Sequence, residues 1–247
     1  MSDPQLFQSA GWRVFGESVV GVAHERVGDE CEDHHRIGCT ADGKLVVAVA
    51  DGAGSAECGG LGAATAVEGA LAAAAASSMS CRETVRASMV AARAAVERAA
   101  TGSRLDRFAT TLILLVADSA GFAIGQVGDG FAVAVDPSGL ALGFSTPQRG
   151  EFANDTAFLT GAAPHEIERV DEWSGPVAGV AVLSDGLQRL ALQLPAATPH
   201  GPFFDRIFRL RELADDAIAA QLSGFLRSSR VRERTVDDLT LVVGWRE

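Results

Sequence analysis

Short apolar runs separated by Gly, Asp and Pro turns fill the middle of the chain, and this pattern constrains the fold most strongly. Each run has the length of a strand and is far too short to span a bilayer. Turns of this kind at this spacing predict neighbouring strands of an antiparallel sheet. The predicted strands are Thr110–Val116, Phe122–Val127, Phe131–Val135 and Leu140–Phe144.

The first element that the pattern predicts is a hairpin. Its strands are His35–Thr40 and Leu45–Ala50, because Asp42-Gly43 between them is a typical turn pair. Leu45–Ala50 has no polar alternation, which predicts a strand that is buried on both faces.

Two alanine-rich stretches without proline follow the hairpin. They predict helices over 59–76 and 80–100, because alanine has the highest helix propensity. Ser80 and Glu83 have the spacing of a capping box at the start of the second helix.

The last third of the chain mixes a polar stretch with further apolar elements. Residues 145–176 predict a long surface excursion, 177–183 a buried strand, 203–227 one helix and 239–245 a final strand. The order of strands and helices is that of an α+β fold with a largely antiparallel sheet. No repeat or linker divides it, so we expect one domain over residues 1–247.

Composition narrows the function. Hydrophobic residues make up 47% of the chain, which is typical of a globular protein. A net charge of −11 repels polyanions and argues against nucleic-acid binding. The sequence has neither a membrane-span pattern nor a secretory-signal pattern, and its four cysteines include no C-x-x-C pair. We therefore expect no membrane partner and a cytoplasmic location.

Acidic residues stand where predicted strands begin or end. Asp51 and Asp185 each follow an apolar strand directly, and Asp237 and Asp238 precede one. In an antiparallel sheet these ends meet at one edge, and crowded carboxylates there need a cation to neutralise them. Oxygen ligands favour magnesium or manganese. The alternative is that each Asp-Gly pair is only a turn.

The ordered set of motifs resembles the metal-dependent protein phosphatases, the PPM or type 2C serine/threonine phosphatases. Two further segments are similar to a small bacterial branch of that family, namely Cys31-Glu32-Asp33 and the stretch from Glu151 to Thr156. The main motifs are VVAVADGAGSAECGG (46–60), ATTLILL (109–115), QVGDGFAV (126–133), VLSDGL (182–187) and DDLTLVV (237–243).

The resemblance implies an antiparallel β-sandwich flanked by helices on both sides, with two manganese or magnesium ions at one edge. Asp51 would bridge both ions. The carbonyl of Gly52 and the side chain of Glu32 would serve one ion, while Asp185 and Asp237 would hold the other.

Three more acids receive roles from the same resemblance. Asp33 matches the acid that orients the attacking water. Asp129 matches a position linked to a weak third metal ion. Asp238 stands behind the ligands and is not expected to bind metal itself.

Phosphate recognition departs from the family pattern. Relatives carry an arginine four residues before the glutamate, where this chain has Gly28. Arg26 is therefore the expected phosphate-binding residue, with His24 as the alternative. Ala53 replaces the histidine that eukaryotic relatives use as a proposed general acid.

The implied function is a serine/threonine protein phosphatase in which a metal-activated water attacks phosphoserine or phosphothreonine in line. The implied partners are a phosphorylated protein substrate and a cognate serine/threonine kinase. Two alternatives stay open: a catalytically silent regulatory module of the same fold, and a phosphoesterase for small molecules.

Four arginines near the end of the chain form a separate feature. They are expected to be a solvated helix end, with a phosphate-attracting patch as the alternative. They are Arg227, Arg230, Arg232 and Arg234.

Overall fold

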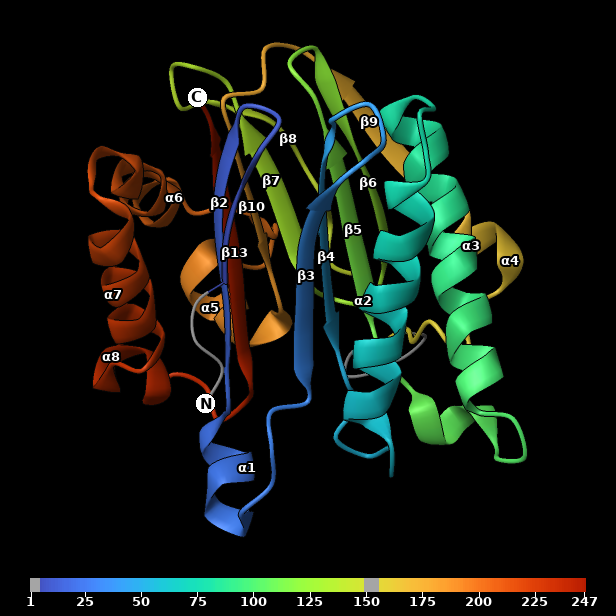
Figure 1. Cartoon of the computed structure of the whole chain (residues 1–247). Coiled ribbons are helices and arrows are strands. Elements are labelled where there is room, and N and C mark those ends of the chain that lie inside the picture. Colours follow the sequence, from blue (N-terminus) through green and yellow to red (C-terminus); the bar gives the residue numbers. More distant parts are fainter. Residues whose placement is uncertain (1–4, 149–155) are drawn as a thin grey trace.

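Two antiparallel sheets lie face to face between two layers of helices in the computed structural model of the chain (Figure 1). The structure describes residues 5–148 and 156–247. This architecture confirms the expected sandwich with helices on both sides. None of the helices in the described residues has the length and apolar character that a membrane crossing requires.

One sheet has six strands in the order β1-β2-β13-β10-β7-β8, which combines the two ends of the chain with its middle. Its strands are β1 (Gln5–Ser9), β2 (Trp12–Val19), β13 (Leu239–Arg246), β10 (Gly179–Leu183), β7 (Phe131–Val135) and β8 (Ala141–Phe144).

The other sheet has five strands in the order β3-β4-β5-β6-β9. Its strands are β3 (Asp33–Cys39), β4 (Leu45–Asp51), β5 (Leu112–Ala117), β6 (Gly121–Val127) and β9 (Val170–Ser174).

The long helices α2 and α3 cover the outer face of the five-stranded sheet, and α6 and α7 cover the outer face of the other (Figure 1). The helices are α1 (Val22–Val27), α2 (Gly59–Ala75), α3 (Cys81–Ala99), α4 (Pro164–Ile167), α5 (Gln188–Ala191), α6 (Gly201–Phe208), α7 (Asp215–Leu226) and α8 (Ser229–Arg232). The short 3₁₀ helices are η1 (Leu105–Phe108), η2 (Asp185–Leu187) and η3 (Arg209–Glu212), and β11 (Leu192–Gln193) pairs with β12 (Thr198–Pro199).

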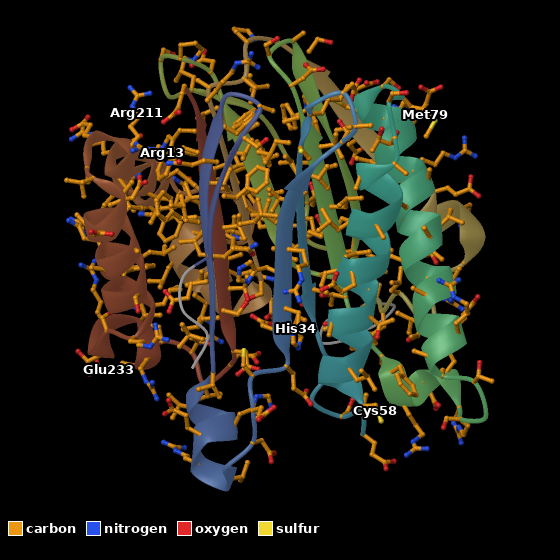
Figure 2. All side chains as sticks on the ribbon, in the orientation of Figure 1. Arg13, His34, Cys58, Met79, Arg211 and Glu233 are labelled. Atoms are coloured by element: carbon orange, nitrogen blue, oxygen red, sulfur yellow. The ribbon has the colours of Figure 1, made fainter. Side chains whose placement is uncertain are left out.

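Strand β4 shows how the sequence builds these layers. Its side chains alternate between two apolar clusters, with Val46 packed under α2 and α3 and Val47 packed between the sheets. Burial on both faces explains the absence of polar alternation in this strand and confirms the prediction for Leu45–Ala50. Figure 2 shows side chains filling both the space between the sheets and the space beneath the helices.

The two alanine-rich stretches form α2 and α3, and their bounds agree with the predicted ranges to within one residue. The capping box is present in α3, where Glu83 N–H donates to Ser80 Oγ and Ser80 N–H donates to the Glu83 carboxylate. This reciprocal pair satisfies donors that the first turn of a helix leaves free.

The prediction of one helix over 203–227 was wrong. The chain forms α6 and η3, becomes extended at Leu213 and Ala214, and then starts α7. Asp215 and Asp216 lie in the first turn of α7, where the helix dipole favours negative charge. Local apolar spacing continued across this break and concealed it.

The prediction of a long surface excursion over 145–176 was incomplete, because it included no helix or strand. Its described residues include α4 and β9, and β9 adds an edge strand to β6. Two of its exposed residues, Asp171 and Glu172, are charged, which is one way in which edge strands avoid further pairing. These charges explain why the segment has a polar sequence. The hairpin β1–β2 and helix α1, before residue 33, were not predicted.

Close packing of α2 against η1 gives a test of the fold. A Cβ at Gly62 would lie 2.3 Å from the carbonyl oxygen of Phe108, whereas a Cβ at Gly224 in α7 would meet no atom within 4 Å. We expect Gly62→Ala to lower the free energy of unfolding by about 1–3 kcal/mol because backbone must move. Gly224→Ala should instead raise it by up to about 1 kcal/mol through helix propensity. Urea unfolding of both variants measures this, and two changes of equal sign would contradict the packing described.

Candidate active site

The segments of both sheets that carry the candidate acids lie at the end of the sandwich where α1 is, the lower end in Figure 1. Asp33 begins β3 and lies opposite Asp51, the last residue of β4. Asp185 follows β10 and Asp237 precedes β13, two antiparallel neighbours in the other sheet. The charges of Asp33, Asp185 and Asp237 all act on Asp51. The structure therefore brings together Asp51, Asp185 and Asp237, three of the acids whose convergence the sequence predicts, and adds Asp33 to them.

Crowding and burial make these acids hard to ionise. Burial, and then the charges of Asp33 and Asp185, raise the pKa of Asp51 well above its usual range. Burial, and then the charge of Asp129, raises the pKa of Asp185 to about 7. The pKa of Asp237 is also raised, chiefly by burial.

The backbone around Asp51 is held tightly. Its N–H donates to Thr111 Oγ1 at 3.0 Å, and its carbonyl oxygen accepts from Thr110 Oγ1 at 2.9 Å. The next residue, Gly52, donates its N–H to the carbonyl of Glu32 at 3.2 Å. A Cβ at Gly52 would lie 2.4 Å from the carbonyl carbon of Gly59, so the start of α2 leaves room only for glycine there.

Asp33 is buried and joins the two sheets through hydrogen bonds. Ser184 Oγ and Thr240 Oγ1 both donate to Asp33 Oδ2, at 2.7 and 2.8 Å. Thr240 Oγ1 lies 2.7 Å from Ser18 Oγ, which in turn lies 2.8 Å from His35 Nδ1. Burial raises the pKa of Asp33 to about 8 despite the two donors. The other oxygen, Asp33 Oδ1, is buried without a hydrogen-bond partner.

Asp238 acts as an anchor beneath the acids. Its carboxylate accepts hydrogen bonds from the N–H of Gly21, from the N–H of Glu32 at 2.6 Å and from His24 Nδ1 at 3.0 Å. These bonds tie the start of α1 and the start of β3 to the strand that follows Asp238. They explain how Glu32 is held beside the other acids even though it lies in a loop.

Asp129 approaches from the β6–β7 turn. Its charge raises the pKa of Asp185, and its Oδ2 accepts from Thr156 Oγ1 at 3.1 Å. Gln188 Nε2 donates to the Asp129 carbonyl at 2.6 Å. Thr156 ends the motif singled out in the sequence, whose other residues, Glu151 to Asp155, lie outside the described part of the chain.

The two candidates for phosphate recognition differ in position. Arg26 is exposed on α1, and its guanidinium group makes neither a hydrogen bond nor an ion pair within the described residues. His24, two residues earlier, contacts Asp238, and its charge interacts with Glu32 and Asp237. Its pKa is raised, because burial, which lowers it, is outweighed by the bond to Asp238 and by these charges.

Three of the acids have a carboxylate oxygen that is buried without a hydrogen-bond donor: Glu32 Oε2, Asp33 Oδ1 and Asp185 Oδ1. Buried oxygens of this kind are costly unless a cation or a proton takes the missing place. In residues 5–148 and 156–247, no three His, Cys, Asp or Glu side chains are arranged as a ready-made metal site. The orphaned oxygens, and a donor set made of oxygen alone, nevertheless fit hard divalent cations such as magnesium or manganese.

The hydroxyls of Ser184, Thr240 and Ser18 were missed by sequence reasoning. They stand in strands or next to them, where Ser and Thr are common and carry no local signal. Side chains alternate between the two faces of a strand, so Thr240 shares a face with Val242 of the inter-sheet core. This alternation is the one sequence signal that could have identified Thr240 as a neighbour of the acids.

The raised pKa values predict how stability changes with pH in the metal-free chain. The carboxyls of Asp33, Asp51 and Asp185 hold their protons more tightly in the folded chain than in the unfolded chain. Their contribution to the free energy of unfolding is therefore complete below about pH 4 and is lost as the pH rises through about 7 to 8. The melting temperature in EDTA should fall between about pH 6 and about pH 8.5, and manganese should reduce that fall.

A matched pair of variants checks the source of this slope. Asp185→Asn removes one of the crowded carboxyls and should flatten the dependence on pH. Asp171→Asn, which makes the same change at an exposed position on β9, should leave it unaltered. Equal slopes in both variants would show that the crowded carboxyls are not the source of the pH dependence.

Comparison with known proteins points to one family. Residues 20–227 match the family described as protein phosphatase 2C. Over 254 residues the chain is 35% identical to serine/threonine-protein phosphatase 3 of Escherichia coli strain K12, covering 96% of this chain and 99% of that one.

Solved structures share the fold at low sequence identity. Serine/threonine phosphatase Stp1 from Staphylococcus aureus superposes with a TM-score of 0.65 at 13% identity, covering 95% of this chain and 94% of that one. The catalytic domain of the phosphatase PstP, in complex with 2 manganese ions, gives a TM-score of 0.63 at 15% identity, covering 95% and 97%.

Proposed function

Because the chain belongs to the protein phosphatase 2C family, we propose that its carboxylate edge holds two divalent cations, manganese or magnesium. The chain is a serine/threonine protein phosphatase, an enzyme that hydrolyses phosphate monoesters on proteins. The observation that carries the proposal is the set of buried carboxylate oxygens without donors at the end of the sandwich. The proposal takes residues 1–247 as one catalytic domain.

The acids divide between the two cations by their position. Asp51 interacts with acids from both sheets and would bind both ions. Glu32 and the carbonyl of Gly52 adjoin it on the five-stranded side and would serve one ion. Asp185 and Asp237, from the six-stranded side, would hold the other. The charge interactions that link Asp51 to Asp185 and Asp237 support this division.

Asp129 is the proposed ligand of a weaker third ion. Its position in the β6–β7 turn and its effect on the pKa of Asp185 support the assignment. It lies in a turn, whereas Asp51 ends a strand of the five-stranded sheet, which accords with weaker binding.

When bound, two such cations supply an activated water and neutralise the charge that develops on the phosphate oxygens during in-line displacement. Asp33 is placed to orient that water, because Oδ1 is free to accept a hydrogen bond while Ser184 and Thr240 hold Oδ2. These two donors prevent the carboxylate from rotating. Ala53 offers no proton, so this chain's residue at that position takes no part in protonating the leaving group.

Two basic side chains are the candidates for binding substrate phosphate. Arg26 remains the proposed residue, because its side chain is exposed and has no partner among the described residues. It lies on α1, and Asp238 holds the start of that helix. His24 is the alternative, since it already lies against the acids and its raised pKa favours the cationic form.

The proposed substrate is a phosphorylated protein, and a serine/threonine kinase that phosphorylates it is the proposed functional partner. Membership of the protein phosphatase 2C family supports this substrate class. All four cysteines are unpaired, and this supports the proposed cytoplasmic location, where thiols stay reduced.

Hydrolysis of a phosphothreonine peptide with manganese tests the central roles. EDTA should abolish turnover, and Asp185→Asn should lower kcat/KM by more than about 100-fold because it removes a proposed metal ligand. Asp171→Asn is the matched control and should stay within about twofold of the unmodified protein. Full activity of Asp185→Asn would show that the acids are assigned wrongly.

The same assay separates the alternatives. Manganese binding without turnover would identify a silent regulatory module. Faster turnover of small phosphate monoesters than of any phosphopeptide would identify a small-molecule phosphoesterase. The buried, uncompensated acids argue against a silent module, because they lower stability without a cation.

Steady-state kinetics distinguishes Arg26 from His24. If Arg26 binds the phosphate, Arg26→Ala should raise KM for the peptide by about tenfold, the loss of one charge-assisted hydrogen bond, with little change in kcat. His24→Ala should then act mainly through Asp238 and lower kcat. The reverse pattern would transfer the role to His24.

A further inference from the structure

A cavity of about 640 Å³ lies between α5, α6, α7 and α8 on the outer side of the six-stranded sheet. These elements form the helical layer on the left of Figure 1, and Figure 2 labels Arg211 and Glu233 within it. Its volume is in the range of small-molecule sites. None of the proposed metal ligands lines it. Its lining includes four arginines and two phenylalanines: Arg189, Arg206, Arg230, Arg234, Phe203 and Phe225.

The rim of the cavity is basic and uncompensated. The four arginines are exposed, and the guanidinium group of each is without a hydrogen bond or ion pair to any residue that the structure describes. Two neighbouring arginines of the same layer behave differently, because Arg227 pairs with Glu17 and Arg232 pairs with Glu25. Glu17 of β2 and Glu25 of α1 therefore neutralise the two arginines beside them, whereas the guanidinium groups at the cavity stay unpaired within the described residues.

The charge of this layer stands out against the rest of the chain. Residues 188–234 contain eight arginines and five Asp or Glu, whereas the whole chain has a net charge of −11. A basic rim on a strongly acidic protein selects anions at that place, because the remaining surface repels them.

The floor of the cavity is apolar. The rings of Phe203 and Phe225 lie 6.0 Å apart and are half-buried. Below them Ile207 and Leu222 belong to the cluster that packs on the sheet. An occupant must therefore offer an apolar or aromatic body to this floor.

We propose that this cavity binds an amphiphilic anion of small-molecule size, with an aromatic or aliphatic body and a phosphate, carboxylate or sulfonate head. The body would lie on Phe203 and Phe225. The head would meet the guanidinium groups, whose planar fork of donors matches such oxyanions. The volume of the cavity and its apolar floor favour this occupant over a solvated helix end, which needs no cavity.

The cavity shares no lining residue with the proposed metal ligands, although some of its residues are close to them in sequence. Arg189 follows Asp185 by four residues, and α5 begins with Gln188, which holds the Asp129 carbonyl. Binding there can be measured without catalysis, so the proposal does not rest on the phosphatase assignment.

A pair of dyes tests the proposal on the full chain. Anilinonaphthalene sulfonate has an aromatic body and a sulfonate that no phosphatase can remove, and N-phenylnaphthylamine has nearly the same body without the charge. Fluorescence titration should show saturable binding of the anionic dye at one site and clearly weaker binding of the neutral dye. Octylphosphonate should displace the anionic dye. Equal affinity for both dyes would overturn the proposal.

Two double variants locate the site. Arg206→Gln with Arg230→Gln should weaken binding of the anionic dye at least about fivefold, because two charge-assisted contacts are lost. Arg98→Gln with Arg246→Gln makes the same change in charge at arginines outside the cavity and should leave binding unaltered. Equal effects would overturn the proposal. Displacement by a phosphothreonine peptide but not by octylphosphonate would show that a protein segment, not a small anion, occupies the cavity.

Discussion

Asp33, the first residue of β3, lies opposite Asp51, the last residue of β4, and Asp185 from the opposite sheet interacts with Asp51. Their mutual repulsion, in a place with little water, is the constraint on which the arrangement of the site depends. It requires a cation or protons at that edge. The same repulsion requires strong anchors in the surrounding backbone.

Those anchors are hydrogen bonds between segments that are distant in the chain. Asp238 binds the N–H groups of Gly21 and Glu32, and Asp33 accepts from Ser184 and Thr240. Packing of the two sheets brings these donors to the acids. The sandwich therefore positions the site, and the site in turn sets which polar residues the sandwich must bury.

Local sequence patterns predicted strands β3 to β8, β10 and β13, the helices α2 and α3, and the acids at the strand ends. Asp51 and Asp185 could be found because each ends an apolar run, and that signal is contained in a few consecutive residues. The anchoring role of Asp238 and the hydroxyls around Asp33 could not be found, since they depend on contacts between residues about 150 to 200 positions apart. The break between α6 and α7 was hidden for a related reason, because apolar spacing continues through Leu213 while the backbone turns.

The most direct test of the two-cation site is to locate manganese in a crystal of the chain by anomalous scattering. We expect ions at about 2.0–2.2 Å from carboxylate oxygens, with Asp51 contacting both and Asp185 and Asp237 contacting one. Manganese bound elsewhere on the surface, with this edge of the sandwich empty, would contradict the assignment of these acids.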